Sequence, residues 1–277
     1  MRTINLIVLD VRNGIVASWQ RGVVAVALFL LMDVMLYRLP EILGEQAVSF
    51  SLGDYFVNTF AGVKEFFPEL NQPIILPFAW LAIILLILYF TLNYPYKDLE
   101  GIGKHILILS GGRRRWWVAK CFWVCLNVLL YFLIWLAVAV FWVLMTKGNF
   151  DFAVSPELPA ILGFEQRIVI QPPWNVSEVI TTTVLVVIAL CLLQMLVSLC
   201  TRPVLAFMVS ITILLFSTYF TSPFLMGNYL MAARSQTFVF FGVNWASGAL
   251  ASIGIMLIVV VLGGWLFGRM DIRGRED

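Results

Sequence analysis

Six long apolar runs determine what this chain can fold into. Each has about 18 to 28 residues, and about 20 residues of helix cross the hydrocarbon of a bilayer. Hydrophobic residues make up 61% of the 277 positions and charged residues only 12%. We therefore expect an all-α polytopic membrane protein whose transmembrane domain, residues 22–277, has six transmembrane helices. The runs lie at residues 22–39, 74–92, 118–145, 179–200, 203–222 and 248–268.

Lysine and arginine residues predict the orientation, because cytoplasmic loops of membrane proteins carry an excess of both. With both termini inside, thirteen of the 18 basic residues fall on the cytoplasmic side and five on the outer side. The segment 94–120, between the second and third runs, carries six of them against two acids. We expect cytoplasmic termini, and the net charge of +2 gives no ground for nucleic-acid binding.

Residues 1–21 predict an amphipathic helix that lies in the membrane interface, with no cleavable signal peptide. Helical spacing puts five apolar side chains on one stripe, and Arg21 then marks where the chain turns into the first run. The stripe consists of Ile4, Val8, Val11, Ile15 and Trp19.

Residues 98–109 predict a short helix at the cytoplasmic membrane surface. Their apolar side chains recur at spacings of three and four, which places them on one helix face. These side chains are Leu99, Ile102, Ile106 and Leu109. The alternative is a solvated loop that arginine and tryptophan side chains anchor at the lipid headgroups.

Asp33 is the one acid well inside an apolar run. A carboxylate in hydrocarbon is costly, so it is a functional candidate by default, for proton or substrate transfer. The structural alternative, which we favour, places Asp33 near the outer end or in a hydrogen bond within the bundle, with Tyr37 as a candidate partner.

The remaining segments predict the outer face and the helix ends. Pro95 should end the second helix, and a short helix should lie on the outer surface within residues 52–67. Residues 223–246 are apolar but broken by glycine and polar residues. We expect them to form a re-entrant outer hairpin of two half-spanning helices.

The sequence contains no pattern typical of a catalytic, cofactor-binding or metal site. The single histidine, His105, has no nearby serine or cysteine nucleophile, and there is no HExxH motif. Residues 109–112 spell LSGG, the signature of ABC-type ATPases, but no phosphate-binding GxxxxGK[ST] loop accompanies it. We therefore expect no enzymatic activity in this chain.

The order of these parts resembles the ABC-2 type permease family, the membrane subunits of ATP-driven exporters. The resemblance covers the whole chain: an interfacial helix, six spans, a basic cytoplasmic helix between spans two and three, and a broken outer hairpin between spans five and six. The most specific piece is LILSGGRRRWWVAK, residues 107–120. It is similar to the family's pattern of a small-residue turn, arginines and a lysine that enters the third span.

The resemblance implies a division of labour in a bacterial plasma membrane. Residues 96–109 would be a coupling helix bound to a separate ABC ATPase subunit, which holds the ATP and magnesium. A second permease copy, identical or not, would complete the pathway among membrane lipids. The cargo would be hydrophobic or amphipathic, with a peptide favoured by the long outer loops. The implied ATPase contacts are Lys97, Asp98, Glu100, Lys104 and His105.

Two alternatives belong to other classes of protein. An ion-coupled secondary transporter would use Asp33, although the sequence has no evident inverted repeat. A non-transporting immunity or scaffold protein would bind a toxin at its outer loops.

Overall fold

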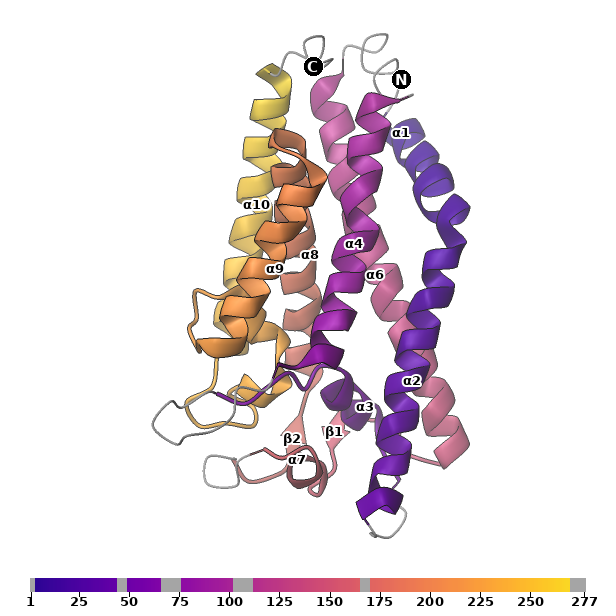
Figure 1. The fold of residues 1–277 in the computed structure, drawn as a ribbon, viewed down its shortest axis with the longest axis vertical. Helices are drawn as coiled ribbons and strands as arrows, with labels where there is room; N and C mark the ends of the chain where they lie inside the picture. The colour runs from indigo at the N-terminus through magenta and orange to yellow at the C-terminus, as the bar shows by residue number, and fades with distance from the viewer. Residues whose placement is uncertain (1–2, 44–48, 66–75, 102–111, 165–169, 270–277) are drawn as a thin grey trace.

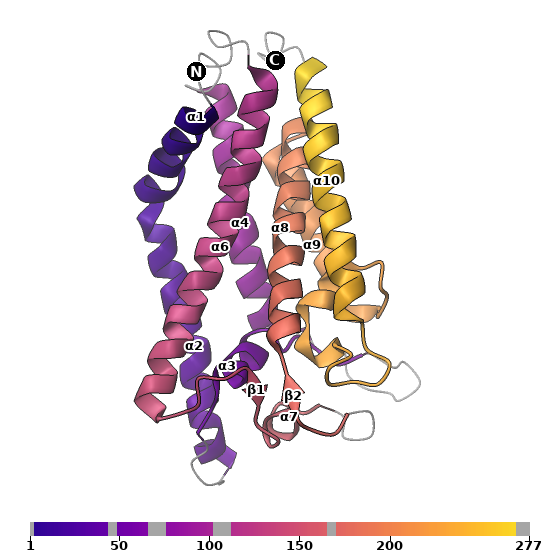
Figure 2. The same ribbon diagram turned by 180° about the vertical axis from the view of Figure 1, so that it is seen from behind.

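The computed structural model describes residues 3–43, 49–65, 76–101, 112–164 and 170–269. Six long helices run along one axis, with α2 and α6 on one side, α8, α9 and α10 on the other, and α4 between them (Figure 1). The view from behind shows α8 and α10 side by side (Figure 2). The bounds are α2 Trp19–Leu43, α4 Phe78–Glu100, α6 Arg113–Thr146, α8 Ser177–Cys200, α9 Pro203–Tyr219 and α10 Trp245–Arg269.

Five helices of the described chain are long and apolar enough to cross a membrane. They include one continuous candidate span, Leu6–Ile42, whereas α9 is an apolar helix of only 17 residues. Apolar side chains also cover the outside of the bundle; on α10, Leu250 and Val261 are 71% and 68% exposed. Such a surface needs lipid around it. The chain is therefore an all-α protein whose several long apolar helices suit a multi-pass membrane protein.

The N-terminal helix α1, Thr3–Asp10, is continuous with α2 in one bent rod (Figure 1). A π-helical turn, Val11–Ile15, and a 3-10 turn, Val16–Ser18, join the two helices. Turns of this kind are a recognised cause of bends in helices. The break that we expected near residue 21 is thus a bend in the rod, and α1 packs along α6.

The first and last helices define the two ends of the bundle used below. The start of α1 and the end of α10 lie at the same end, which we call the terminal end (Figure 1). The opposite end, which we call the cap end, carries α3, Leu52–Thr59, the short helix α7, Leu158–Ile161, and a two-stranded sheet. In this sheet β1, Ala153–Val154, pairs antiparallel with β2, Trp174–Asn175. Helix α3 is the short helix expected within residues 52–67.

Pro95 lies inside α4, so the prediction that it ends this helix was wrong. Proline removes the backbone donor to the carbonyl four residues earlier, here that of Thr91. Membrane helices tolerate this loss where neighbouring side chains satisfy the backbone. Tyr94 and Asp98, on either side of Pro95, are bonded to Asp10 of α1 and Lys120 of α6. These tertiary contacts favour a helix that continues past Pro95.

Asp54 fastens α3 to the segment that follows β1. Its carboxylate accepts hydrogen bonds from the backbone N–H of Ser51 at 2.8 Å and from the N–H and Oγ of Ser155 at 2.8 and 2.6 Å. Burial raises the pKa of Asp54, while these hydrogen bonds act in the opposite direction. The cap is thus held by a buried polar residue as well as by apolar packing.

Residues 223–246 contain two short 3-10 turns, Met226–Leu230 and Ala232–Arg234. The prediction of two half-spanning helices there was wrong. The backbone is held instead by Arg234, which is 2% exposed. Burial lowers the pKa of Arg234 to about 10, so it is still charged at neutral pH. Its guanidinium donates to oxygens of Val63, Lys64, Ser217, Thr218 and Asn228.

Two of these hydrogen bonds cap the C-terminal end of helix α9. The carbonyls of Ser217 and Thr218 lie in its last turn, where helix carbonyls have no partner within the helix. A cation at this position also interacts favourably with the helix dipole. Arg234 therefore joins the end of α9 to the chain that follows α3.

We predict that Arg234→Met lowers the free energy of unfolding by about 3 kcal/mol, because several buried oxygens lose their donor. Denaturant unfolding of the purified protein in detergent micelles measures this change. Arg38→Met is the matched control, since Arg38 is exposed on α2. Equal stability of the two variants would contradict the role of Arg234.

Candidate functional site

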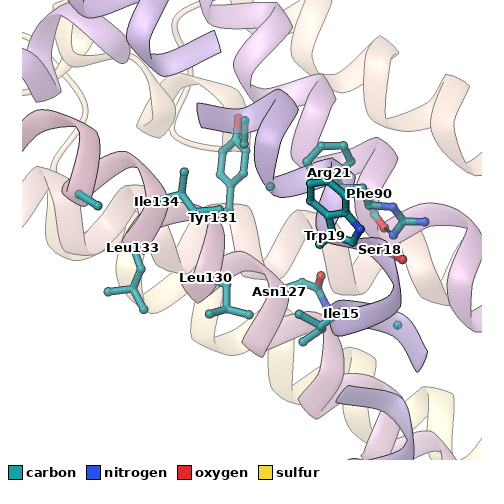
Figure 3. Close-up of a pocket in the computed structure, with 14 residues that line it drawn as sticks. Ile15, Ser18, Trp19, Arg21, Phe90, Asn127, Leu130, Tyr131, Leu133 and Ile134 are labelled. Atoms are coloured by element: carbon teal, nitrogen blue, oxygen red, sulfur yellow. Dashed lines mark hydrogen bonds between the residues drawn. The ribbon is translucent and has the colours of Figure 1, made fainter. Parts of the chain in front are cut away.

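A groove of about 320 Å³ lies between α2 and α6 (Figure 3). One end is formed by Trp19, Arg21 and Phe90, and the other by Leu130, Leu133 and Ile134. The lining is largely apolar. Trp19 is 67% exposed and Leu133 is 57% exposed, so the groove opens on the flank of the bundle, where lipid would lie.

Arg21 is the charged residue of this groove. Its guanidinium donates to the backbone carbonyl of Phe90 at 2.8 Å and lies 6.0 Å from the centre of the Phe90 ring. Within the described part of the chain, no carboxylate forms an ion pair with it. Arg21 is therefore a partly buried cation with unused hydrogen-bond donors.

Arg21 lies beside the middle of α4. Its partner Phe90 is twelve residues from the first residue of α4 and ten from the last, or about 18 and 15 Å at 1.5 Å per residue. We expected Arg21 where the chain turns into the first span, and in the structure it belongs to the continuous candidate span Leu6–Ile42.

A second polar site, the Lys120 cluster, lies toward the terminal end of the bundle. Lys120, on α6, is 1% exposed. Its ammonium group pairs with Asp10 of α1 and, at 2.8 Å, with Asp98 of α4. The cluster therefore joins three segments that are far apart in the sequence.

Aromatic side chains complete the Lys120 cluster. The Tyr94 hydroxyl donates to Asp10 at 2.9 Å, and Trp116 Nε1 donates to Asp98 at 3.0 Å. The rings of Tyr94 and Trp116 also lie 4.6 and 5.2 Å from the ammonium group, within range of cation–π attraction. Buried charges are stable only when paired and hydrogen-bonded in this way.

The cluster lies at both ends of the basic segment 94–120, which contains the predicted coupling helix, residues 96–109. Asp98 is near the end of α4 and Lys120 is in the second turn of α6. Lys97 is exposed, whereas the carboxylate of Asp98 is bonded within the protein. Glu100 is the last residue of α4. Lys104, His105 and most of the helix expected at residues 98–109 lie outside the described residues.

Asp33 is fully buried between α2 and its neighbours. Neither carboxylate oxygen has a hydrogen-bond partner among the residues that the structure describes. Tyr37, the partner suggested from the sequence, is 51% exposed and stacks on Trp142 with ring centres 5.7 Å apart. Among the described residues, Asp33 thus forms no hydrogen bond or ion pair with Tyr37, Arg21 or the Lys120 cluster.

No family model, curated protein or solved structure matches this chain. The groove, the Lys120 cluster and Asp33 are therefore the features that bear on function.

We predict that Lys120→Met lowers the free energy of unfolding by about 3 kcal/mol, because it leaves two carboxylates without their shared cation. Adding Asp10→Asn and Asp98→Asn should recover part of the loss. Unfolding in detergent micelles measures both effects. Arg115→Met is the control, because Arg115 is exposed on the same helix. Equal free energies of unfolding for Lys120→Met and Arg115→Met would show that the cluster does not stabilise the protein.

We predict that Asp33→Asn leaves stability unchanged or raises it by about 1 kcal/mol, because a buried polar group without partners is costly and its charged form more so. Thermal unfolding of the two proteins side by side tests this. A loss of 2 kcal/mol or more would show that the carboxylate has a favourable partner.

Proposed function

We propose that this chain is the membrane-spanning subunit of an exporter that is driven by a separate ABC ATPase. The proposed cargo is hydrophobic or amphipathic and moves outward; the sequence favours a peptide. The supporting observation is the Lys120 cluster, which fastens both ends of the basic segment between α4 and α6 to α1. A segment that receives force from a partner needs such a firm attachment to the helices that move.

The cluster offers a route from the cytoplasmic surface to the groove. Asp98 and Phe90 belong to the same helix, and so do Lys120 and Leu130. The third partner, Asp10, ends α1, and the bent rod continues from there to Arg21 on α2. A displacement of the basic segment would therefore move all three walls of the groove.

Coupling of this kind requires two states with different contacts. ATP binding would close the ATPase dimer and shift the basic segment, and the rearranged helices would alter the groove. In this proposal the ATP and magnesium belong to the partner, a second permease copy completes the pathway, and the chain itself carries out no catalysis. The cytoplasmic placement of both termini in a bacterial plasma membrane is part of the same proposal.

We predict that an ATP-binding subunit co-purifies with the tagged protein from native membranes, and that Lys97→Glu lowers its yield about ten-fold. Lys97 is exposed at the end of α4, where a charge reversal opposes an acidic partner surface. Quantitative mass spectrometry of the eluate measures the yield.

The matched control is Lys147→Glu, because Lys147 is exposed at the other end of α6. Replacing residues 98–105 should abolish the association, since these residues contain most of the proposed contacts. An undiminished complex after that replacement would refute the coupling segment.

Asp33 supports one other candidate, an ion-coupled secondary transporter. A buried carboxylate without partners in a span is a candidate proton carrier. This candidate requires transport that runs on an ion gradient without ATP and stops in Asp33→Asn. The exporter proposed above requires ATP and persists in the same variant, so one transport assay separates the two.

A further inference from the structure

The guanidinium of Arg21 has no anionic partner among the described residues. A charged side chain that is partly buried in an apolar groove of a membrane protein is costly and is normally neutralised by a partner or exposed to water. The described residues supply one carbonyl, that of Phe90, and no carboxylate. The remaining donors of the guanidinium are therefore available to a ligand in the groove.

The rest of the groove favours an alkyl chain. Leu130, Leu133 and Ile134 line the end away from Arg21, and the groove opens toward lipid past Trp19. The groove is thus a long apolar trough with a cation at one end, which suits an alkyl chain that carries an anionic head.

We propose that the groove binds a single-chain anionic amphiphile, with its charged head on Arg21 and its alkyl chain along Leu130, Leu133 and Ile134. The head supplies the charge that Arg21 lacks, and its oxygens accept charge-assisted hydrogen bonds. The alkyl chain of the ligand covers the apolar side chains that line the groove. This inference concerns binding alone and holds whether or not an ATPase drives the protein.

A bilayer phospholipid has the same chemistry, an anionic head on alkyl chains. Competition with phosphatidylglycerol separates this occupant from a single-chain amphiphile.

The test uses three probes with the same sixteen-carbon chain: hexadecyl sulfate, hexadecanol and hexadecyltrimethylammonium. The sulfate stays charged at every working pH. Each probe is added at graded mole fractions to the purified full-length protein in phosphatidylcholine nanodiscs, and native mass spectrometry counts the protein that retains one adduct. We expect half-saturation at about ten-fold less sulfate than alcohol, and the weakest binding for the cation.

Variants assign the adduct to the groove. Arg21→Gln should remove the preference for sulfate over alcohol, and Arg21→Lys should keep most of it. Ile134→Trp should weaken both probes by filling the apolar end. Arg38→Gln, which removes an exposed arginine from the same helix, is the matched control and should change nothing. Thermal unfolding checks each variant, and the three-probe comparison on the unaltered protein needs no variant at all.

Four outcomes would overturn the proposal. Equal half-saturation by sulfate and alcohol would show that Arg21 does not select an anion. Unchanged binding in Ile134→Trp would place the adduct elsewhere. Displacement of the sulfate by phosphatidylglycerol, one for one, would identify a leaflet lipid as the occupant. Displacement by a helical peptide with a free carboxylate would identify a peptide.

Discussion

Helix α4 is the structural centre of the bundle because side chains from three other helices donate hydrogen bonds to its backbone. Tyr131 of α6 binds the carbonyl of Ile83 at 2.8 Å, and Gln194 of α8 and Arg21 of α2 bind two carbonyls further along. Hydrocarbon offers no competing water, so each of these polar groups must find its partner within the protein.

The groove and the Lys120 cluster lie at two levels of the same three elements. The rod of α1 and α2, helix α4 and helix α6 meet through charged groups at the terminal end and also form the groove that holds Arg21. Helix α6 is one continuous helix between Lys120 and Leu130, so a movement of its first turns can reach the groove. This arrangement gives the proposed coupling a physical path, with the basic segment at one end and a ligand groove at the other.

Sequence patterns predicted the positions of the helices well, but they did not predict the contacts between the helices. Five of the apolar runs overlap the helices that are long enough to span, and the sixth overlaps α9. Pro95 and residues 223–246 were predicted wrongly because contacts with residues distant in the sequence hold these segments. Tyr94 and Asp98 beside Pro95 are bonded to Asp10 and Lys120, and Arg234 binds backbone carbonyls from other segments. Asp33 stood out in the sequence, yet Asp10 and Lys120 did not, since each looks like an ordinary charge near a helix end.

The length and polarity of the apolar runs were enough to predict a membrane protein and the approximate extent of its helices, because each run must match the hydrocarbon that surrounds it. Which charges are buried together depends on the packing of the helices. The pairing of Lys120 with Asp10 and Asp98, and the bond of Arg21 to a carbonyl instead of a carboxylate among the described residues, depend on how helices rotate and cross against one another. Local periodicity carries no information about those rotations, so both sites emerged only from the packed bundle.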